Sequence, residues 1–149
     1  SIIHSMIEYA DGSVIAQMGH PDMREAIQFA FSYPYRLSLD NRKLNFAELG
    51  SMSFHAPDQS RFPALSLAYE ALEKGGNMPC IMNAANEAAV AAFLKEEIGF
   101  YDITDIVGEC MAGADFVAEP DLDTIFRTNE AALAKAGELI DRISGKRTI

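Results

Sequence analysis

Residues 2–18 read IIHSMIEYADGSVIAQM, two short apolar runs separated by a turn sequence. The first run, residues 2–9, and the second, residues 13–18, are rich in residue types that favour β-strands. Between them stands Asp11-Gly12, the dipeptide most typical of a tight hairpin turn. We therefore predict an antiparallel β-hairpin over these residues.

The predicted turn determines which residues of the two strands face each other. With a two-residue turn, Tyr9 pairs with Val14, and further along the ladder His4 lies opposite Gly19. This register brings His4 beside Pro21–Met23, where the second strand gives way to a helix. Imidazole changes charge near neutral pH and can act as an acid, a base or an anchor for a ligand. A strand histidine can equally be a structural residue, so both interpretations of His4 stay open on the residues alone.

The residues after the hairpin predict helices separated by one long irregular segment. Asp22 is a suitable N-cap, with Glu25 at the spacing of a capping box, and Tyr33-Pro34 would end this helix because proline cannot continue it. Apolar periodicity is lost between residues 37 and 60, which indicates a linker. Helical periodicity then recurs in four segments: from Pro63 to Gly75, from about Pro79 to Lys95, from about Ile103 to Met111, and after Pro120.

The composition is that of a water-soluble globular protein, with 49% hydrophobic and 23% charged residues. A net charge of −10 would repel phosphate backbones and argues against nucleic-acid binding. No apolar run approaches the roughly 20 residues that cross a bilayer, so no membrane association is expected. Cys80 and Cys110 lack the spacing of a disulfide framework or zinc site, which favours free thiols in a reducing compartment. The strand follows Ser1 at once, which suggests a cut inside a longer polypeptide.

Two further segments carry residues suited to chemistry, and each has a structural alternative. Pro21-Asp22-Met23 either begins a helix, with the aspartate as its cap, or forms an apolar wall against a substrate or planar cofactor. Asn83 and Glu87 share a predicted helix face and either bind metal or substrate or fix helix packing by hydrogen bonds. Because the sequence contains no glycine-rich phosphate loop and no nucleophile elbow, a self-contained active site is not expected.

A set of longer motifs follows in order along nearly the whole chain. They are SIIHSMI (1–7), DGSV (11–14), AQMGHPDMR (16–24), APD (56–58), RFP (61–63), LAYEA (67–71) and NAANEAAVAAFL (83–94), with Phe100 and Asp102-Ile103 after them. Together they resemble the 1-deoxy-D-xylulose 5-phosphate reductoisomerase family. The residues after about Ala112 are the least distinctive.

The resemblance implies an NADP-dependent oxidoreductase and isomerase of isoprenoid biosynthesis. Family members convert 1-deoxy-D-xylulose 5-phosphate to 2-C-methyl-D-erythritol 4-phosphate with NADPH and Mg or Mn, as cytoplasmic homodimers. By resemblance, His4 is the active-site histidine, which binds the substrate and supports proton movement. Pro21 and Met23 match the apolar residues that close over the substrate, and Met23 also over the nicotinamide, whereas we assign Asp22 to helix capping.

The resemblance also implies an α+β chain in three parts. Residues 1–37 would be the end of an α/β catalytic domain, as a hairpin and helix, residues 38–60 a linker, and residues 61–149 an all-α domain of four helices. The family's dinucleotide-binding domain, metal-binding carboxylates and mobile flap would precede Ser1. The chain alone is therefore expected to bind no cofactor or metal and to be inactive.

The alternative hypothesis is a free-standing helical interaction or scaffolding module without catalysis. The regular, alanine-rich pattern of the second half of the chain favours it. A start codon directly before Ser1 would support this alternative, whereas an upstream reading frame with a glycine-rich nucleotide-binding turn would support the enzyme.

Overall fold

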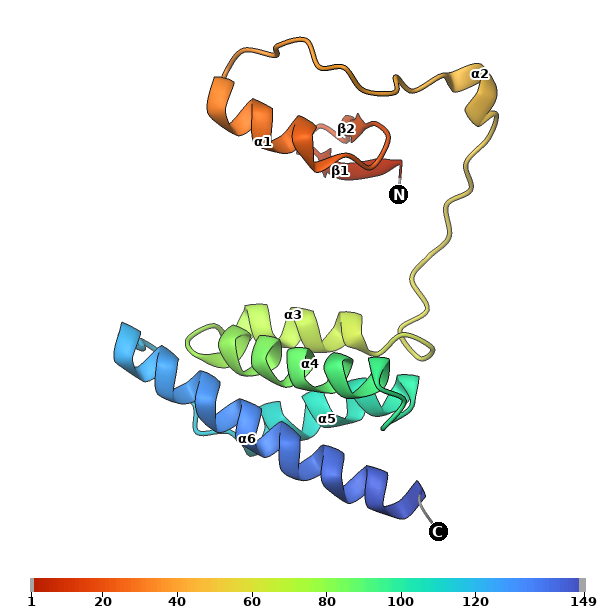
Figure 1. The fold of residues 1–149 in the computed structure, drawn as a ribbon. Coiled ribbons are helices and arrows are strands. Elements are labelled where there is room, and N and C mark those ends of the chain that lie inside the picture. The colour runs from red at the N-terminus through yellow and green to blue at the C-terminus, as the bar shows by residue number, and fades with distance from the viewer. Residues whose placement is uncertain (1, 148–149) are drawn as a thin grey trace. The chain divides into compact units, whose positions relative to one another are not determined.

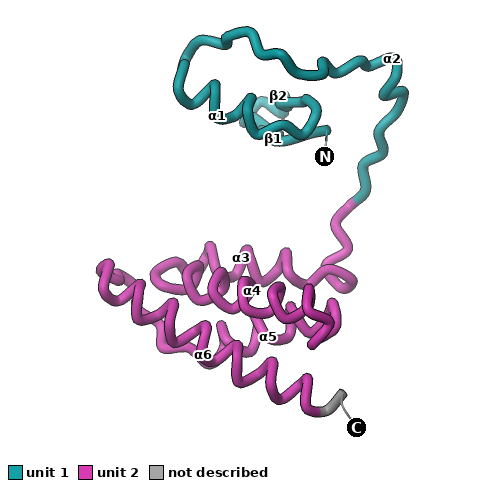
Figure 2. Tube along the Cα trace, viewed as in Figure 1, with its two compact units in different colours: residues 1–55 teal, residues 56–149 magenta. Residues whose placement is uncertain are grey.

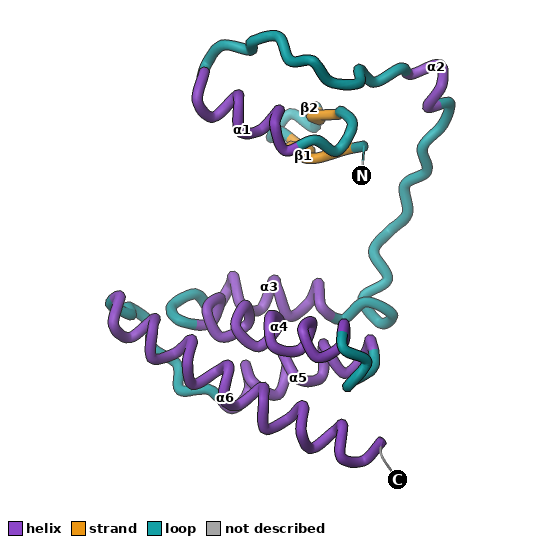
Figure 3. Tube along the Cα trace, in the orientation of Figure 1, coloured by secondary structure: helices purple, strands orange, loops and turns teal. Residues whose placement is uncertain are grey.

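The computed structural model describes residues 2–147, and the chain divides into two compact units, residues 1–55 and residues 56–149 (Figure 2). Unit 1 contains the elements β1 (Ile3–Glu8), β2 (Val14–Met18), α1 (Met23–Ser32) and α2 (Phe46–Leu49). Unit 2 contains α3 (Ala64–Lys74), α4 (Met78–Leu94), α5 (Phe100–Gly113) and α6 (Leu122–Arg147) (Figure 1). The strands pair in unit 1 and four helices pack in unit 2 (Figure 3), which confirms the predicted α+β class.

The hairpin forms where it was predicted, but its register is not the predicted one. The backbone N–H of Tyr9 donates to the carbonyl oxygen of Ser13 at 2.9 Å, and that of Gly12 donates to the carbonyl oxygen of Tyr9 at 2.9 Å. These bonds close a three-residue loop whose last residue, Gly12, has a left-handed φ of 81°. Because the loop is one residue longer than expected, Val14 pairs with Glu8 instead of Tyr9.

A second irregularity places His4 outside the regular ladder. Ile3 pairs with Met18 and Ser5 pairs with Gln17, so β1 has one residue more than β2 between these two pairs, and that residue is His4. This is a β-bulge, which bends a strand and re-aims the side chain of the extra residue. The predicted direct pairing of His4 with Gly19 is therefore wrong in its register.

Helix α1 begins as predicted, but one detail of its start differs. The carboxylate of Asp22 accepts a hydrogen bond from the backbone N–H of Arg24 at 3.0 Å, which confirms Asp22 as the N-cap. The expected capping box with Glu25 is not formed. Instead, the carboxylate of Glu25 accepts a hydrogen bond from the side-chain amide of Asn41, which lies in the irregular segment after α1.

Unit 2 is organised around α4, which contacts α3, α5 and α6. Its buried positions are mostly alanines, and small side chains allow neighbouring helices to approach closely. Helix α5 begins at Phe100, slightly before the predicted start near Ile103, because the carboxylate of Asp102 accepts the backbone N–H of Gly99 at 2.6 Å. Within residues 2–147, no helix has the length and apolar character needed to cross a membrane.

We expect an added side chain on the buried face of α4 to destabilise unit 2. Ala89 has 0% of its surface exposed, so Ala89→Leu should lower the free energy of unfolding by about 1–3 kcal/mol through overpacking. Ala91 lies on the exposed face of the same helix and provides the matched control, Ala91→Leu. Urea denaturation followed by circular dichroism measures both variants, and equal stability of the two would contradict the assigned core.

Candidate functional site

Two side chains of unit 1, one from β1 and one from α1, meet at Gly19, directly after β2. A Cβ atom built on Gly19 would lie 3.7 Å from Cε1 of His4 and 3.2 Å from Oε2 of Glu25. Gly19 is buried, and its backbone N–H donates to the carbonyl oxygen of Ile2 at 3.0 Å, which fixes it against β1. The structure therefore brings His4 to Gly19 as the sequence predicted, but it does so through the bulge.

The imidazole of His4 is exposed on one side of this cluster, and Glu25 is half-buried on the other. An exposed imidazole next to a buried glycine can contact a ligand and can exchange a proton with it. A Cβ atom in place of Gly19 would press on the carboxylate of Glu25 and would make ordinary van der Waals contact with the imidazole. Gly19 therefore lies in close contact with both groups.

The segment Pro21–Met23 follows Gly19 directly and leads into α1. The carboxylate of Asp22 accepts hydrogen bonds from the guanidinium of Arg24, the shortest at 2.6 Å, and from its backbone N–H. The hydrogen bond from the side chain of Arg24, and then the one from its backbone N–H, lower the pKa of Asp22. The carboxylate of Asp22 is thus engaged at the start of the helix. Pro21 is exposed, and Met23 leaves 70% of its surface exposed, so both apolar side chains are available to a ligand.

The second candidate pair, Asn83 and Glu87, lies on the exposed face of α4 in unit 2. The side-chain amide of Asn83 is 3.5 Å from Oε1 of Glu87, at the outer limit of a hydrogen bond. Among the described residues 2–147, no group of three histidine, cysteine, aspartate or glutamate side chains is arranged to hold a metal ion. The geometry of this pair favours the structural interpretation.

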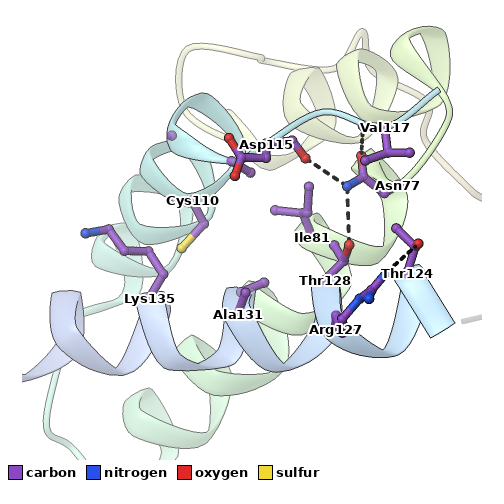
Figure 4. A pocket seen from close by; sticks show the side chains of 13 residues that line it. Asn77, Ile81, Cys110, Asp115, Val117, Thr124, Arg127, Thr128, Ala131 and Lys135 are labelled. Atoms are coloured by element: carbon purple, nitrogen blue, oxygen red, sulfur yellow. Dashed lines mark hydrogen bonds between the residues drawn. The ribbon is translucent and has the colours of Figure 1, made fainter. Parts of the chain in front are cut away.

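A cavity of about 360 Å³ opens in unit 2 between α4, α6 and the segment after α5 (Figure 4). At its edge Asn77 is buried, and its side-chain amide donates to the carbonyl oxygen of Asp115 at 2.9 Å and to Oγ1 of Thr128 at 3.3 Å. Its Oδ1 accepts the backbone N–H of Val117 at 3.0 Å. Asn77 therefore joins three segments of unit 2, a role that no motif in the sequence indicated.

Two of the charged groups around this cavity form contacts with other side chains, and its thiol is buried. Arg127 donates to Oγ1 of Thr124 at 3.0 Å, and Lys135 pairs with Glu138 at 3.1 Å. Cys110 is a free thiol, as predicted, and burial raises its pKa. These contacts make the cavity a feature of helix packing, and the geometry favours the His4 cluster as the site.

Comparison with known sequences identifies relatives over most of the chain. The family described as "DXP reductoisomerase C-terminal domain" matches residues 18–135. The 1-deoxy-D-xylulose 5-phosphate reductoisomerase of Bacteroides thetaiotaomicron is 49% identical over 140 residues, which cover 94% of this chain and 36% of that protein. The enzyme of the same name from Acetivibrio thermocellus is 53% identical over 125 residues, which cover 84% of this chain and 33% of that protein.

Solved structures are similar over the same range. The 1-deoxy-D-xylulose 5-phosphate reductoisomerase from Zymomonas mobilis in complex with NADPH has a TM-score of 0.84 at 45% identity and covers 94% of this chain. A DOX-P reductoisomerase in complex with NADPH, fosmidomycin and magnesium has a TM-score of 0.82 at 37% identity and covers 95%. The chain spans only 37% of each of these two structures. By sequence and by fold, the chain belongs to the family of the DXP reductoisomerase C-terminal domain.

Proposed function

We propose that this chain forms the C-terminal part of an enzyme that converts 1-deoxy-D-xylulose 5-phosphate to 2-C-methyl-D-erythritol 4-phosphate with NADPH and Mg²⁺ or Mn²⁺. The observation that carries the proposal is the 49% identity to a reductoisomerase over 94% of this chain. Structures of similar chains contain NADPH, magnesium and fosmidomycin, which is consistent with these cofactors. As with the family, we propose a cytoplasmic homodimer.

In this proposal His4 binds the substrate and holds or moves a proton during the rearrangement. Its exposed imidazole projects from a bulge beside buried Gly19, a geometry that supports contact with a ligand. Pro21 and Met23 would cover the apolar part of the substrate, and Met23 would also touch the nicotinamide. Their exposed side chains support this role, because apolar groups over a bound ligand exclude water from it.

The proposal assigns residues 1–37 to the end of the catalytic domain, residues 38–60 to a linker and residues 61–149 to the helical domain. The boundary between the two compact units, after His55, lies within this linker. In α1 the large apolar side chains are exposed, with Ile27 at 51% and Phe31 at 90%. Such a face needs a partner, and the remainder of the catalytic domain would provide it.

The metal ion and most contacts to NADPH would come from other parts of the complete protein. The described residues 2–147 offer no cluster of three metal ligands, so they do not fit the metal site by themselves. The residues of this chain would contribute the imidazole of His4 and the apolar cover of Pro21 and Met23.

The isolated chain of 149 residues is expected to be inactive. Titration with NADPH and Mg²⁺, followed by fluorescence of the reduced nicotinamide, should show no saturable binding. The reason is that the chain lacks a metal-ligand cluster among its described residues and contains no glycine-rich nucleotide loop. Saturable binding of NADPH would contradict the assignment of the cofactor site to the rest of the enzyme.

The proposed function is tested on the complete protein that carries this chain. Consumption of NADPH should require both 1-deoxy-D-xylulose 5-phosphate and a divalent cation, and NMR of the product should identify 2-C-methyl-D-erythritol 4-phosphate. Reactions without substrate and with EDTA are the controls. A folded protein that consumes no NADPH under these conditions would contradict the proposal and would favour the non-catalytic helical module.

A further inference from the structure

We infer that Glu25 is a positioning residue for His4, acting through the orientation and charge of the imidazole. This inference rests on the proposed catalytic role of His4. Glu25 stands at the spacing of a capping box, but the structure shows that Asp22 caps the start of α1 without it. The carboxylate of Glu25 is therefore available for another role.

The geometry around Gly19 places the carboxylate and the imidazole against the same point. Cε1 of His4 and both carboxylate oxygens of Glu25 lie within 4 Å of the position where a side chain of Gly19 would begin. These two distances place Cε1 of His4 no more than about 7 Å from Oε2 of Glu25. A single water molecule can bridge two polar groups at such a separation.

Asn41 fixes the carboxylate in this position. Its side-chain amide donates to Oε1 of Glu25, while Oε2 is the oxygen nearer to Gly19. Asn41 and Glu25 are both half-buried, so the contact between them is partly shielded from water. One oxygen is thus held by the segment after α1, and the other is the one nearer to Gly19.

A carboxylate beside an imidazole does two things that a catalytic histidine requires. It selects the tautomer whose N–H faces the carboxylate, and it stabilises the positive charge of the imidazolium when the ring accepts a proton. The second ring nitrogen is then left for the substrate. Glu25 would not touch the substrate itself, and its effect would pass entirely through His4.

The test uses the complete enzyme with the variants Glu25→Gln and Glu25→Ala. Glutamine keeps an oxygen that can accept the hydrogen bond of Asn41 but removes the charge, whereas alanine removes both. We expect both variants to lower kcat by about tenfold. This loss is smaller than the roughly 100-fold in rate that a positioned acid–base group such as His4 contributes, because Glu25 acts only through His4. The KM for NADPH should stay unchanged. In a His4→Gln background, Glu25→Gln should cause no further loss, because the two residues act as one unit.

The matched control is Glu8→Gln, which removes an exposed carboxylate at the far end of β1. It should leave both kcat and KM at the wild-type values. A wild-type kcat for Glu25→Gln would overturn the inference, even if Glu25→Ala loses activity, because Glu25 would then only anchor Asn41.

A second readout does not depend on turnover. In NMR spectra of the complete protein at a fixed pH, Glu25→Gln should move the Cε1–H resonance of His4 and leave that of His55 in place. An unmoved His4 resonance would overturn the inference. If the wild-type protein fails to convert 1-deoxy-D-xylulose 5-phosphate, the proposed function is wrong, and the resonance alone then decides whether Glu25 positions His4.

Discussion

Replacing His4 by glutamine in the complete enzyme is expected to lower kcat/KM for 1-deoxy-D-xylulose 5-phosphate by about 100-fold or more. Glutamine keeps a hydrogen-bonding group of similar length but cannot gain or lose a proton near neutral pH. His4 is exposed and lies at a bulge, so its replacement removes no core packing and should leave the fold intact. Steady-state kinetics give the loss, and the far-ultraviolet circular dichroism spectrum confirms that the variant is folded.

His55→Gln is the matched control for this experiment. His55 is also an exposed histidine, but it lies in the irregular segment at the end of unit 1. We expect this variant to keep the wild-type kcat/KM. If His4→Gln had the same kcat/KM as His55→Gln, the catalytic assignment of His4 would be wrong.

Gly76→Ala is expected to have the largest effect on the stability of unit 2. Gly76 has a left-handed φ of 56°, and a Cβ atom there would lie 2.2 Å from the carbonyl oxygen of Val117. This oxygen belongs to the backbone and accepts the N–H of Asn77, so it cannot move without breaking the contacts of Asn77. Backbone strain and overpacking together should lower the free energy of unfolding by about 3 kcal/mol or more.

The neighbouring glycine separates the two causes. Gly75 also has a positive φ, 65°, but a Cβ atom there would meet nothing within 4 Å. Gly75→Ala should therefore lower the free energy of unfolding by about 1–3 kcal/mol, less than Gly76→Ala, from backbone strain alone. Urea denaturation measures the free energy of unfolding of both variants. Equal losses of stability would show that a side chain at position 76 does not clash with the carbonyl oxygen of Val117.

Much of the fold was predictable because its signals are local. Asp11-Gly12 indicated the turn, Asp22 the start of α1, and Gly75-Gly76 the end of α3, and the structure confirms all three. The register was not predictable in the same way. The same dipeptide closes either a two-residue or a three-residue loop, and only the hydrogen bonds of Tyr9 distinguish them.

The candidate site was predictable in part for a similar reason. His4 lies in β1 and Gly19 directly follows β2, so a hairpin was enough to predict that they meet. Glu25 and Asn41 are joined across an irregular segment, and no periodicity indicates which of its residues folds back onto α1. Asn77 was missed because its three side-chain bonds reach segments that are distant in sequence.

His4 is expected to contribute to a substrate site in the complete enzyme. The most direct measurement is calorimetric titration of 1-deoxy-D-xylulose 5-phosphate into the complete protein with Mg²⁺ and without NADPH, so that no turnover occurs. We predict that His4→Gln weakens substrate binding at least about tenfold, equivalent to about 1.4 kcal/mol, whereas His55→Gln binds like the wild type. Equal substrate affinity of His4→Gln and the wild-type protein would contradict the claim.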